Sequence, residues 1–263
     1  MLLVIGNPTN IYLSSIFNLS FIEYFKFMVI PSLFIGISSF FALLFLFKKP
    51  LKKKIEVFEL EETKINNKFI LVASLIHLSI TTILLAVSSY LNLDMWIIAL
   101  TFMISLLIIL FAYSLIKKDK IYIVKPLKRI PYNLIPFILA MFTLINALDS
   151  FNFFDNIASL LHDNQIAYLI SSTLTCNVVN NIPMTLAFGS ILSNTDNIRL
   201  IYSTIIGSNI GAIITPVGAL AGIMWMKLLK DNNVKYSFLD FTKNGVIIII
   251  ILLITSSISL FII

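Results

Sequence analysis

The chain has 263 residues, of which 59% are apolar and 12% are charged. Water-soluble domains are about 45 to 50% apolar and about 25% charged, so this composition excludes an ordinary soluble protein. The net charge of +6 indicates membrane topology rather than a nucleic-acid partner, because the lysines lie in loops between apolar segments. The single cysteine, Cys176, excludes an internal disulfide, and no His, Cys, Asp or Glu residues have metal-ligand spacing. We therefore expect neither a nucleic-acid partner nor a metal.

Long apolar stretches recur along the chain, each close to the ~20 residues that an α-helix needs to cross a ~30 Å hydrocarbon core. They cover residues 27–47, 69–91, 95–116, 133–149, 201–226 and 244–263, with a further stretch at 166–192. The expected fold class is an all-α membrane protein built as a helical bundle. Its expected location is the cell membrane, which it crosses several times, with the lipid bilayer as its surroundings.

Lysine-rich segments give the expected orientation of these spans. Cytoplasmic loops carry an excess of Lys and Arg, and such residues occur in the linker at 48–68, in the loop after residue 116 and at 227–243. The loop around Asp155 contains no lysine or arginine. We therefore expect the three basic segments inside the cell, and the C-terminus outside.

The stretch at 166–192 is expected to enter and leave the membrane on the same side. Between the outer loop and the cytoplasmic Lys227 the number of crossings must be odd, yet two apolar stretches lie there. An Asn-Asn-Ile-Pro run at 180–183 interrupts the first of them, and proline removes a backbone donor from a helix. We predict a re-entrant hairpin within 156–194 whose tip holds this run. Irregular backbone at that depth is tolerated only where it is buried in protein or lines a polar cavity.

The stretch at 201–226 is expected to be a discontinuous helix. Glycines are frequent in it, Pro216 follows Thr215, and the break is predicted between Ser208 and Gly218. Breaks of this kind serve transporters, because half-helix N-termini attract anions and unwound carbonyls coordinate cations. Small residues also occur in ordinary packed membrane helices, so packing alone is the alternative interpretation.

Three runs of residues together resemble the ion transporter superfamily. They are Asn180-Asn181-Ile182-Pro183-Met184-Thr185 as a hairpin tip, Gly207 to Ala221 as a broken helix, and Gly6-Asn7-Pro8-Thr9-Asn10 near the start. This superfamily contains the arsenical pump membrane proteins, the divalent-anion/sodium symporters and the citrate-transporter-like permeases, and the arsenical pump type is the nearest match. The resemblance implies a secondary transporter of small anions or oxyanions, such as arsenite or carboxylates.

The resemblance also implies two inverted repeats, each with a re-entrant hairpin and a broken helix. Pairing Gly6 with Gly218, 212 residues later, assigns 1–47 to a remnant of the first repeat, 48–68 to a cytoplasmic linker and 69–263 to the second repeat. The chain would then be the second half of an inverted-repeat transporter. We expect either an incomplete chain or a second polypeptide that supplies the missing half. A homodimer would supply it only with difficulty, because both copies would insert in the same orientation.

Ten residues at the hairpin tip and the two breaks form the candidate substrate- or ion-binding set. They are Asn180, Asn181, Thr185, Ser208, Asn209, Thr215, Gly218, Asn7, Thr9 and Asn10. Their side chains offer neutral amide and hydroxyl groups, which suit an oxyanion as well as a neutral hydroxide such as arsenous acid. No cofactor is expected, and coupling to Na⁺ or H⁺ stays open. Acidic and basic residues are absent from the span interiors, which argues against a carboxylate proton relay.

Two further side chains each allow a functional and a structural interpretation, and two other protein classes are alternatives. His77 lies inside a span and is either a proton carrier or a histidine hydrogen-bonded to a neighbouring helix. Cys176 is either an arsenic ligand or, as is more usual for a buried cysteine, a small apolar residue. An intramembrane enzyme is not expected, because paired carboxylates and a histidine cluster are missing. A non-transporting membrane subunit or a channel-like fragment is the alternative to a transporter.

Overall fold

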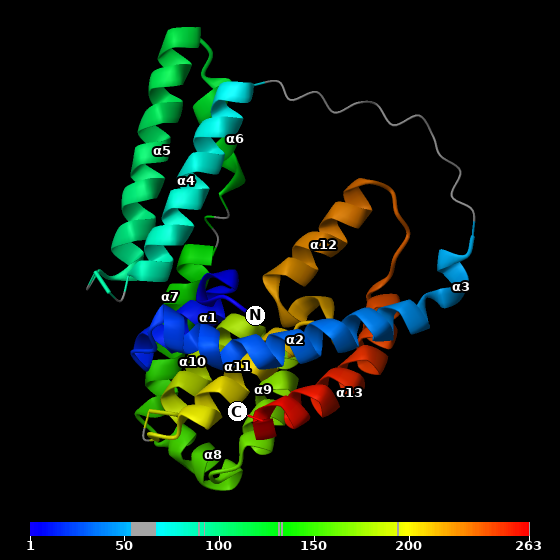
Figure 1. The fold of residues 1–263 in the computed structure, drawn as a ribbon. Coiled ribbons are helices and arrows are strands. Elements are labelled where there is room, and N and C mark those ends of the chain that lie inside the picture. The colour runs from blue at the N-terminus through cyan, green and yellow to red at the C-terminus, as the bar shows by residue number, and fades with distance from the viewer. Residues whose placement is uncertain are drawn as a thin grey trace. The chain divides into compact units, whose positions relative to one another are not determined.

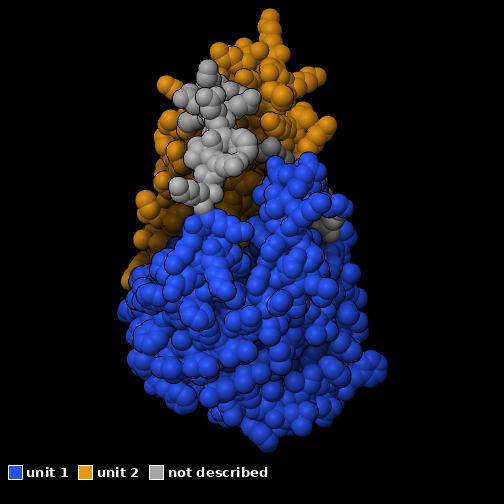
Figure 2. Space-filling model, turned by 90° about the vertical axis from the view of Figure 1, so that its right-hand side faces the viewer, with its two compact units in different colours: residues 1–53, 135–263 blue, residues 54–134 orange. Residues whose placement is uncertain are grey.

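The computed structural model describes residues 1–53, 67–88, 90–91, 93–130, 132, 134–193 and 195–262. All regular elements in these ranges are helices, which confirms the predicted fold class. The chain divides into two compact units, a larger one of residues 1–53 and 135–263 and a smaller one of residues 54–134 (Figure 2). All ten candidate residues lie in the larger unit.

The smaller unit is built around two long apolar helices that pack side by side. Its helices are α4 (Lys68–Val87), α5 (Met95–Lys117) and α6 (Ile121–Arg129). The stretch predicted at 95–116 matches α5, whereas the one predicted at 69–91 ends earlier. The reason is a turn after Val87, in which the hydroxyl of Ser88 donates to the carbonyl oxygen of Leu85 at 2.8 Å. Most of the linker at 48–68 lies outside the described residues.

The larger unit begins with a short 3₁₀ helix and three α-helices. They are η1 (Val4–Gly6), α1 (Pro8–Ile16), α2 (Phe21–Leu46) and α3 (Lys48–Leu51). α2 starts before the predicted residue 27, because Ser20 and Glu23 form a capping box. The Ser20 N–H donates to Glu23 Oε2 at 3.0 Å, and the Glu23 N–H donates to Ser20 Oγ at 3.2 Å.

The next two helices form a bent pair. α7 (Leu134–Asp149) matches the stretch predicted at 133–149, and α8 (Phe153–Leu161) lies where an outer loop was expected. The two axes differ by 78°. α8 carries an apolar side that buries Phe154, which explains why this acidic segment folds as a helix rather than as an open loop.

The remaining helices contain the predicted hairpin and the predicted broken helix. They are α9 (Gln165–Val179), α10 (Asn181–Ile191), α11 (Ile198–Gly211), η2 (Pro216–Gly218), α12 (Leu220–Asp231) and α13 (Phe238–Ile262). The stretch 166–192 is therefore a helix-turn-helix hairpin, as predicted. The stretch 201–226 is interrupted between α11 and α12, also as predicted. That the hairpin re-enters the membrane from the outside stays a prediction.

Close contact between α9 and α11 forms the centre of the larger unit. Gly207 and Gly211 permit this contact because they have no Cβ. A Cβ on Gly207 would lie 2.5 Å from Leu169 O, and one on Gly211 would lie 2.5 Å from Cys176 Sγ, both too close. Small residues four apart allow helix backbones to approach in this way. α2 and α13 pack along one another next to this pair (Figure 1), and Ser38 Oγ lies 3.1 Å from Thr255 Oγ1 between them.

Several helices are long and apolar enough to cross a membrane. Among the described residues these are Phe21–Leu46, Lys68–Val87, Met95–Lys117 and Phe238–Ile262, and the bent pair of α7 and α8 adds a fifth if it counts as one span. The stretch predicted at 201–226 is not a continuous span, because neither α11 nor α12 reaches the required length. The chain is a multi-pass membrane protein.

Candidate binding site at two helix breaks

The two predicted breaks have the same backbone conformation. In the first, the 3₁₀ helix Val4–Gly6 is followed by extended Asn7, with φ −152° and ψ 136°, and then by α1. In the second, the 3₁₀ helix Pro216–Gly218 is followed by extended Ala219, with φ −152° and ψ 156°, and then by α12. The equivalent residues are 212 positions apart, which agrees with the pairing of Gly6 and Gly218.

The tip of the hairpin binds the second break. Asn180 joins α9 to α10 with φ 76° and ψ 155°, a strained conformation that residues other than glycine rarely adopt. Its side-chain oxygen accepts a hydrogen bond from the Ile182 N–H at 3.3 Å, and its amide nitrogen donates to the Val217 carbonyl oxygen at 2.8 Å. One side chain thus caps α10 and satisfies a carbonyl group of η2.

Asn177 is the residue that sequence reasoning missed. Its amide nitrogen donates to the Gly211 carbonyl oxygen at 2.9 Å, and its amide oxygen accepts from both the N–H and the hydroxyl of Thr215, at 2.9 and 2.8 Å. This side chain therefore replaces backbone hydrogen bonds that α11 loses where it ends. A lone asparagine one turn before the tip was the available signal, but its role depends on the packing of α9 against α11.

The first break meets α11 through a cluster of polar side chains. Asn209 Nδ2 donates to Asn10 Oδ1 at 2.7 Å, and Asn7 Nδ2 donates to Asn209 Oδ1 at 3.3 Å. Ser208 Oγ donates to Thr9 Oγ1 at 3.1 Å. The structure thus brings together five candidate residues that are about 200 positions apart in the sequence.

Ser208 and Asn209 do not lie in unwound backbone, which corrects the predicted extent of the break. α11 continues to Gly211. Gly207 and Gly211 allow α11 to pack tightly on α9, and the helix ends where this contact ends. The interruption covers residues 212–219. Of the candidate residues, Thr215 and Gly218 belong to it, and a Cβ on Gly218 would lie 2.8 Å from Asn177 Oδ1.

The second arm of the hairpin carries Asn181 and Thr185, both of which are buried. The Thr185 hydroxyl donates to the Asn181 carbonyl oxygen at 2.7 Å. The Asn181 side chain is 4% exposed, and no hydrogen bond of its amide is found among the described residues. A small cavity of about 120 Å³ lies between α1, α7 and α10, and it is lined by Pro8, Thr9, Tyr12, Ile138, Phe142, Ile182, Thr185 and Leu186.

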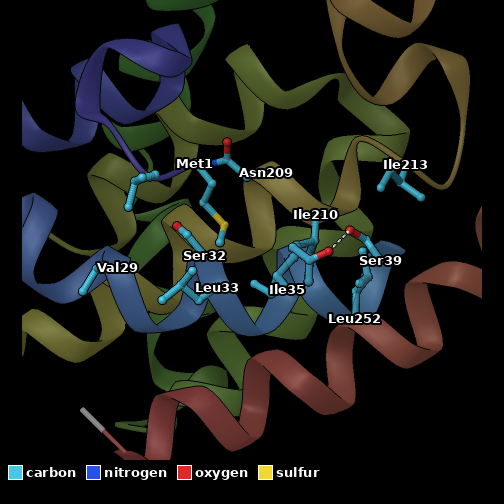
Figure 3. Close-up of a pocket in the computed structure, with 12 residues that line it drawn as sticks. Met1, Val29, Ser32, Leu33, Ile35, Ser39, Asn209, Ile210, Ile213 and Leu252 are labelled. Atoms are coloured by element: carbon cyan, nitrogen blue, oxygen red, sulfur yellow. Dashed lines mark hydrogen bonds between the residues drawn. The ribbon is translucent and has the colours of Figure 1, made fainter. Parts of the chain in front are cut away.

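A larger cavity of about 470 Å³ lies beside Asn209 (Figure 3). It is lined by Met1, Leu2, Val29, Ser32, Leu33, Ile35, Gly36, Ser39, Asn209, Ile210, Ile213 and Leu252. The hydroxyl of Ser32 is buried there without a hydrogen-bond partner among the described residues. Asn209 is the one candidate residue among those that line this cavity.

Comparison with known proteins identifies the family. The family model described as "Arsenical pump membrane protein" matches residues 1–263, which is the whole chain. The chain belongs to the arsenical pump membrane protein family. No solved structure matches it significantly.

Individual relatives match about half of the chain. A relative in Bacillus subtilis (strain 168) is 29% identical over 132 residues, which are 45% of this chain and 30% of the relative. The arsenical pump membrane proteins of Escherichia coli (strain K12) and Yersinia enterocolitica are each 27% identical over 136 residues, 47% of this chain and 32% of the relative. The matched part spans about a third of the length of these relatives.

In this member of the arsenical pump family the candidate site is neutral. The side chains that converge on the two breaks are amides and hydroxyls, which donate and accept hydrogen bonds without carrying charge. No group of three or more His, Cys, Asp or Glu residues that could hold a metal ion occurs in the described part of the chain. A ligand held by these side chains would be bound through hydrogen bonds rather than through ion pairs.

His77 and Cys176, for which functional roles were considered possible, both have hydrogen-bond partners within the chain. In the smaller unit, His77 Nδ1 lies 2.8 Å from the Ala73 carbonyl oxygen and its Nε2 lies 3.2 Å from Ser105 Oγ on α5. Cys176 is fully buried, and its thiol donates to the Thr173 carbonyl oxygen at 3.1 Å. These contacts fit the interhelical histidine and the small buried cysteine better than a proton carrier and an arsenic ligand.

Proposed function

We propose that this chain acts in a secondary membrane transporter of small anions or oxyanions of the arsenite type. The observation that carries the proposal is that the first break bonds to α11, and the hairpin bonds to the break at the end of α11, through neutral polar side chains. Discontinuous helices that meet near the middle of a bilayer are the usual way in which secondary transporters build a substrate site.

Asn181 is the strongest candidate for direct contact with the substrate. Asn181 is 4% exposed, and its amide is not among the fully buried polar groups that lack a partner, so the amide keeps a small accessible surface. The other candidate amides, those of Asn7, Asn10, Asn180 and Asn209, already have partners within the chain. The Asn181 amide is therefore free to donate to and accept from a hydroxylated ligand, which is a physical reason for the residue to bind substrate.

The names of the relatives favour an arsenic compound over a carboxylate. The Escherichia coli and Yersinia enterocolitica relatives are named arsenical pump membrane proteins. The site itself allows both substrates, since amides and hydroxyls bind an oxyanion or an uncharged hydroxide equally. We therefore propose arsenite as the first substrate to test and citrate as the comparison.

Uptake by proteoliposomes that contain the 263-residue chain tests the proposal. We expect saturable uptake of arsenite above the level of protein-free vesicles, with little uptake of citrate. Asn181→Ala should lower uptake about tenfold, because one hydrogen bond to a buried site is worth about 1 to 2 kcal/mol. Asn156→Ala is the matched control, since Asn156 is an exposed asparagine on α8, and it should leave uptake unchanged.

The same vesicles distinguish the competing interpretations. Uptake that rises with an imposed sodium gradient would identify Na⁺ as the coupling ion, and uptake that responds only to a pH gradient would identify H⁺. Uptake that does not saturate would instead indicate a channel. Vesicles that take up no more arsenite than protein-free ones would contradict transport by the 263-residue chain on its own.

A further inference from the structure

A basic cavity lies at the end of α12, away from the two breaks. Its volume is about 550 Å³, and it is lined by Met226, Lys227, Lys230, Asn233, Val234, Lys235 and Tyr236. Three of these seven residues are lysines, and no acidic residue is among them. The candidate transport site does not involve any of them.

The turn that ends α12 brings the three lysines together. Lys227 and Lys230 are three positions apart and therefore lie on the same side of the helix. Asn233 then adopts a left-handed conformation with φ 57°, and the Val234 N–H donates to the Leu229 carbonyl oxygen at 2.9 Å. This helix-ending turn reverses the chain, so Lys235 lines the same cavity as the two helical lysines.

Positive charge exceeds negative charge at this cavity, because three lysines line it and Asp231 is the one acidic residue of α12. Lys227, Lys230 and Lys235 are exposed, and no ion pair to any of them is found among the described residues. The nearby carboxylate of Asp240 accepts hydrogen bonds from the N–H and the hydroxyl of Ser237, at 3.0 and 2.6 Å. The cavity is therefore suited to a ligand that brings its own negative charge.

An aromatic cluster lies directly beside the lysines. The ring of Trp225 contacts Tyr236 and Phe241 edge to face, with centroids 5.3 and 5.7 Å apart. The Tyr236 hydroxyl accepts a hydrogen bond from Asn244 Nδ2 at 3.0 Å. Tryptophan and tyrosine gather where membrane helices meet the polar headgroup region, and this cluster is typical of that level.

Exposed apolar side chains flank the cavity on both helices. Met224 and Leu228 on α12 are 67% and 60% exposed, and Leu239 on α13 is 76% exposed. In a membrane protein such a surface contacts acyl chains. A ligand with an anionic head and apolar tails would match the lysines and the flanking surface at the same time.

We propose that this cavity binds the headgroup of an anionic phospholipid. The ammonium groups of the three lysines would contact the phosphate as point charges, and the acyl chains would lie along the exposed faces of α12 and α13. Basic pockets at helix ends bind anionic headgroups in other membrane proteins. Free inorganic phosphate would satisfy the lysines but would leave the aromatic cluster and the apolar flanks without a role.

Native mass spectrometry of the detergent-purified chain tests this site. The chain is mixed with equal amounts of phosphatidylglycerol and phosphatidylcholine, and the retained lipids are counted. We expect preferential retention of phosphatidylglycerol. The triple variant K227A/K230A/K235A should weaken that retention at least tenfold, since each lysine near an anionic headgroup contributes about fivefold to affinity.

The triple variant K117A/K118A/K120A is the matched control. It removes the same three charges from the segment around the end of α5 and should retain the lipid as the unmodified chain does. Equal losses in both variants would mean unspecific attraction and would overturn the proposal. Displacement of the lipid by millimolar inorganic phosphate would identify a phosphate site instead. Because this readout does not use transport, it stands or falls separately from the proposed function.

Discussion

The two helix breaks share a backbone conformation but differ in how their polar groups are satisfied. In the first break, Asn7 caps its own helix, since its side-chain oxygen accepts from the Thr9 N–H at 3.3 Å. In the second break, Ala219 stands at the equivalent position and has no side chain that could cap α12. Asn177 and Asn180 on the hairpin donate to other groups of the second break, the carbonyl oxygens of Gly211 and Val217.

This difference shows two solutions to one physical problem. Backbone groups freed by a break inside a membrane protein must find partners in the protein or in a water-filled cavity. The first break has a local partner and needs no other helix for its cap. The second break depends on the hairpin, so hairpin position and break geometry are coupled, and a movement of one changes the other.

The largest expected effect is that of Asn177→Ala. The substitution removes the bonds to Gly211 O and to the N–H and hydroxyl of Thr215, which leaves polar groups of the second break without partners. We expect a loss of about 3 kcal/mol in unfolding free energy, measured by thermal unfolding in detergent. Asn156→Ala should change stability by less than about 0.5 kcal/mol. A similar stability for both variants would contradict the conclusion that hairpin side chains stabilise the second break.

Gly207→Val should have the next largest effect, because it separates the helices that bring the hairpin to the break. The added Cβ would approach Leu169 O to 2.5 Å, and overpacking of this kind costs about 1 to 3 kcal/mol. The same thermal unfolding assay measures it. Gly36→Ala is the control, since a Cβ there meets nothing within 4 Å, and it should be neutral or slightly stabilising. A neutral Gly207→Val variant would contradict the close contact of α9 and α11.

Asn7→Ala should cost less than Asn177→Ala, although both remove an asparagine from a break. The helix cap contributes about 1 kcal/mol, and the hydrogen bond to Asn209 adds to it. Asn7→Ser keeps a capping oxygen but lacks the amide donor, so its unfolding free energy should lie between those of Asn7→Ala and the unmodified chain. If Asn7→Ala were more destabilising than Asn177→Ala, the proposed difference between the breaks would be wrong: the first would not rely mainly on its own cap, nor the second on the hairpin.

Ala219→Ser should have the smallest effect and the opposite sign. Serine at this extended position can cap α12 in the way that Asn7 caps α1, and a cap is worth about 0.5 to 1 kcal/mol. In the Asn177→Ala background we expect the substitution to restore part of the lost stability in the same unfolding assay. No gain in either background would mean that the two equivalent positions do not have equivalent roles.

The sequence predicted the places where the helices break. The Asn-Asn-Ile-Pro run predicted a hairpin tip over Asn180–Thr185, because proline and asparagine act on the local backbone; the structure places the turn at Asn180 and begins α10 at Asn181. The pairing of Gly6 with Gly218 predicted two equivalent breaks, and the equal φ of Asn7 and Ala219 supports it. Features encoded by a few adjacent residues could therefore be read directly from the sequence.

Features that depend on tertiary contacts could not be read in this way. The role of Asn177 requires α11 to lie beside α9, and the extension of α11 to Gly211 follows from the same contact. The helix α8 was missed, because the acidic residues around Asp155 suggested a loop. Whether further sequence precedes Met1, as expected from the resemblance, stays a prediction.

The attachment of the hairpin tip to the second break is tested most directly by cross-linking in native membranes. Asn180→Cys and Val217→Cys are introduced together in a Cys176→Ala background, which removes the single natural cysteine, and a short bifunctional thiol reagent is added. Because Asn180 Nδ2 lies 2.8 Å from Val217 O, we predict efficient cross-linking of this pair and none of Asn180→Cys with Leu239→Cys, which serves as the control. Cross-linking of the 180–217 pair no greater than that of the control would contradict the account.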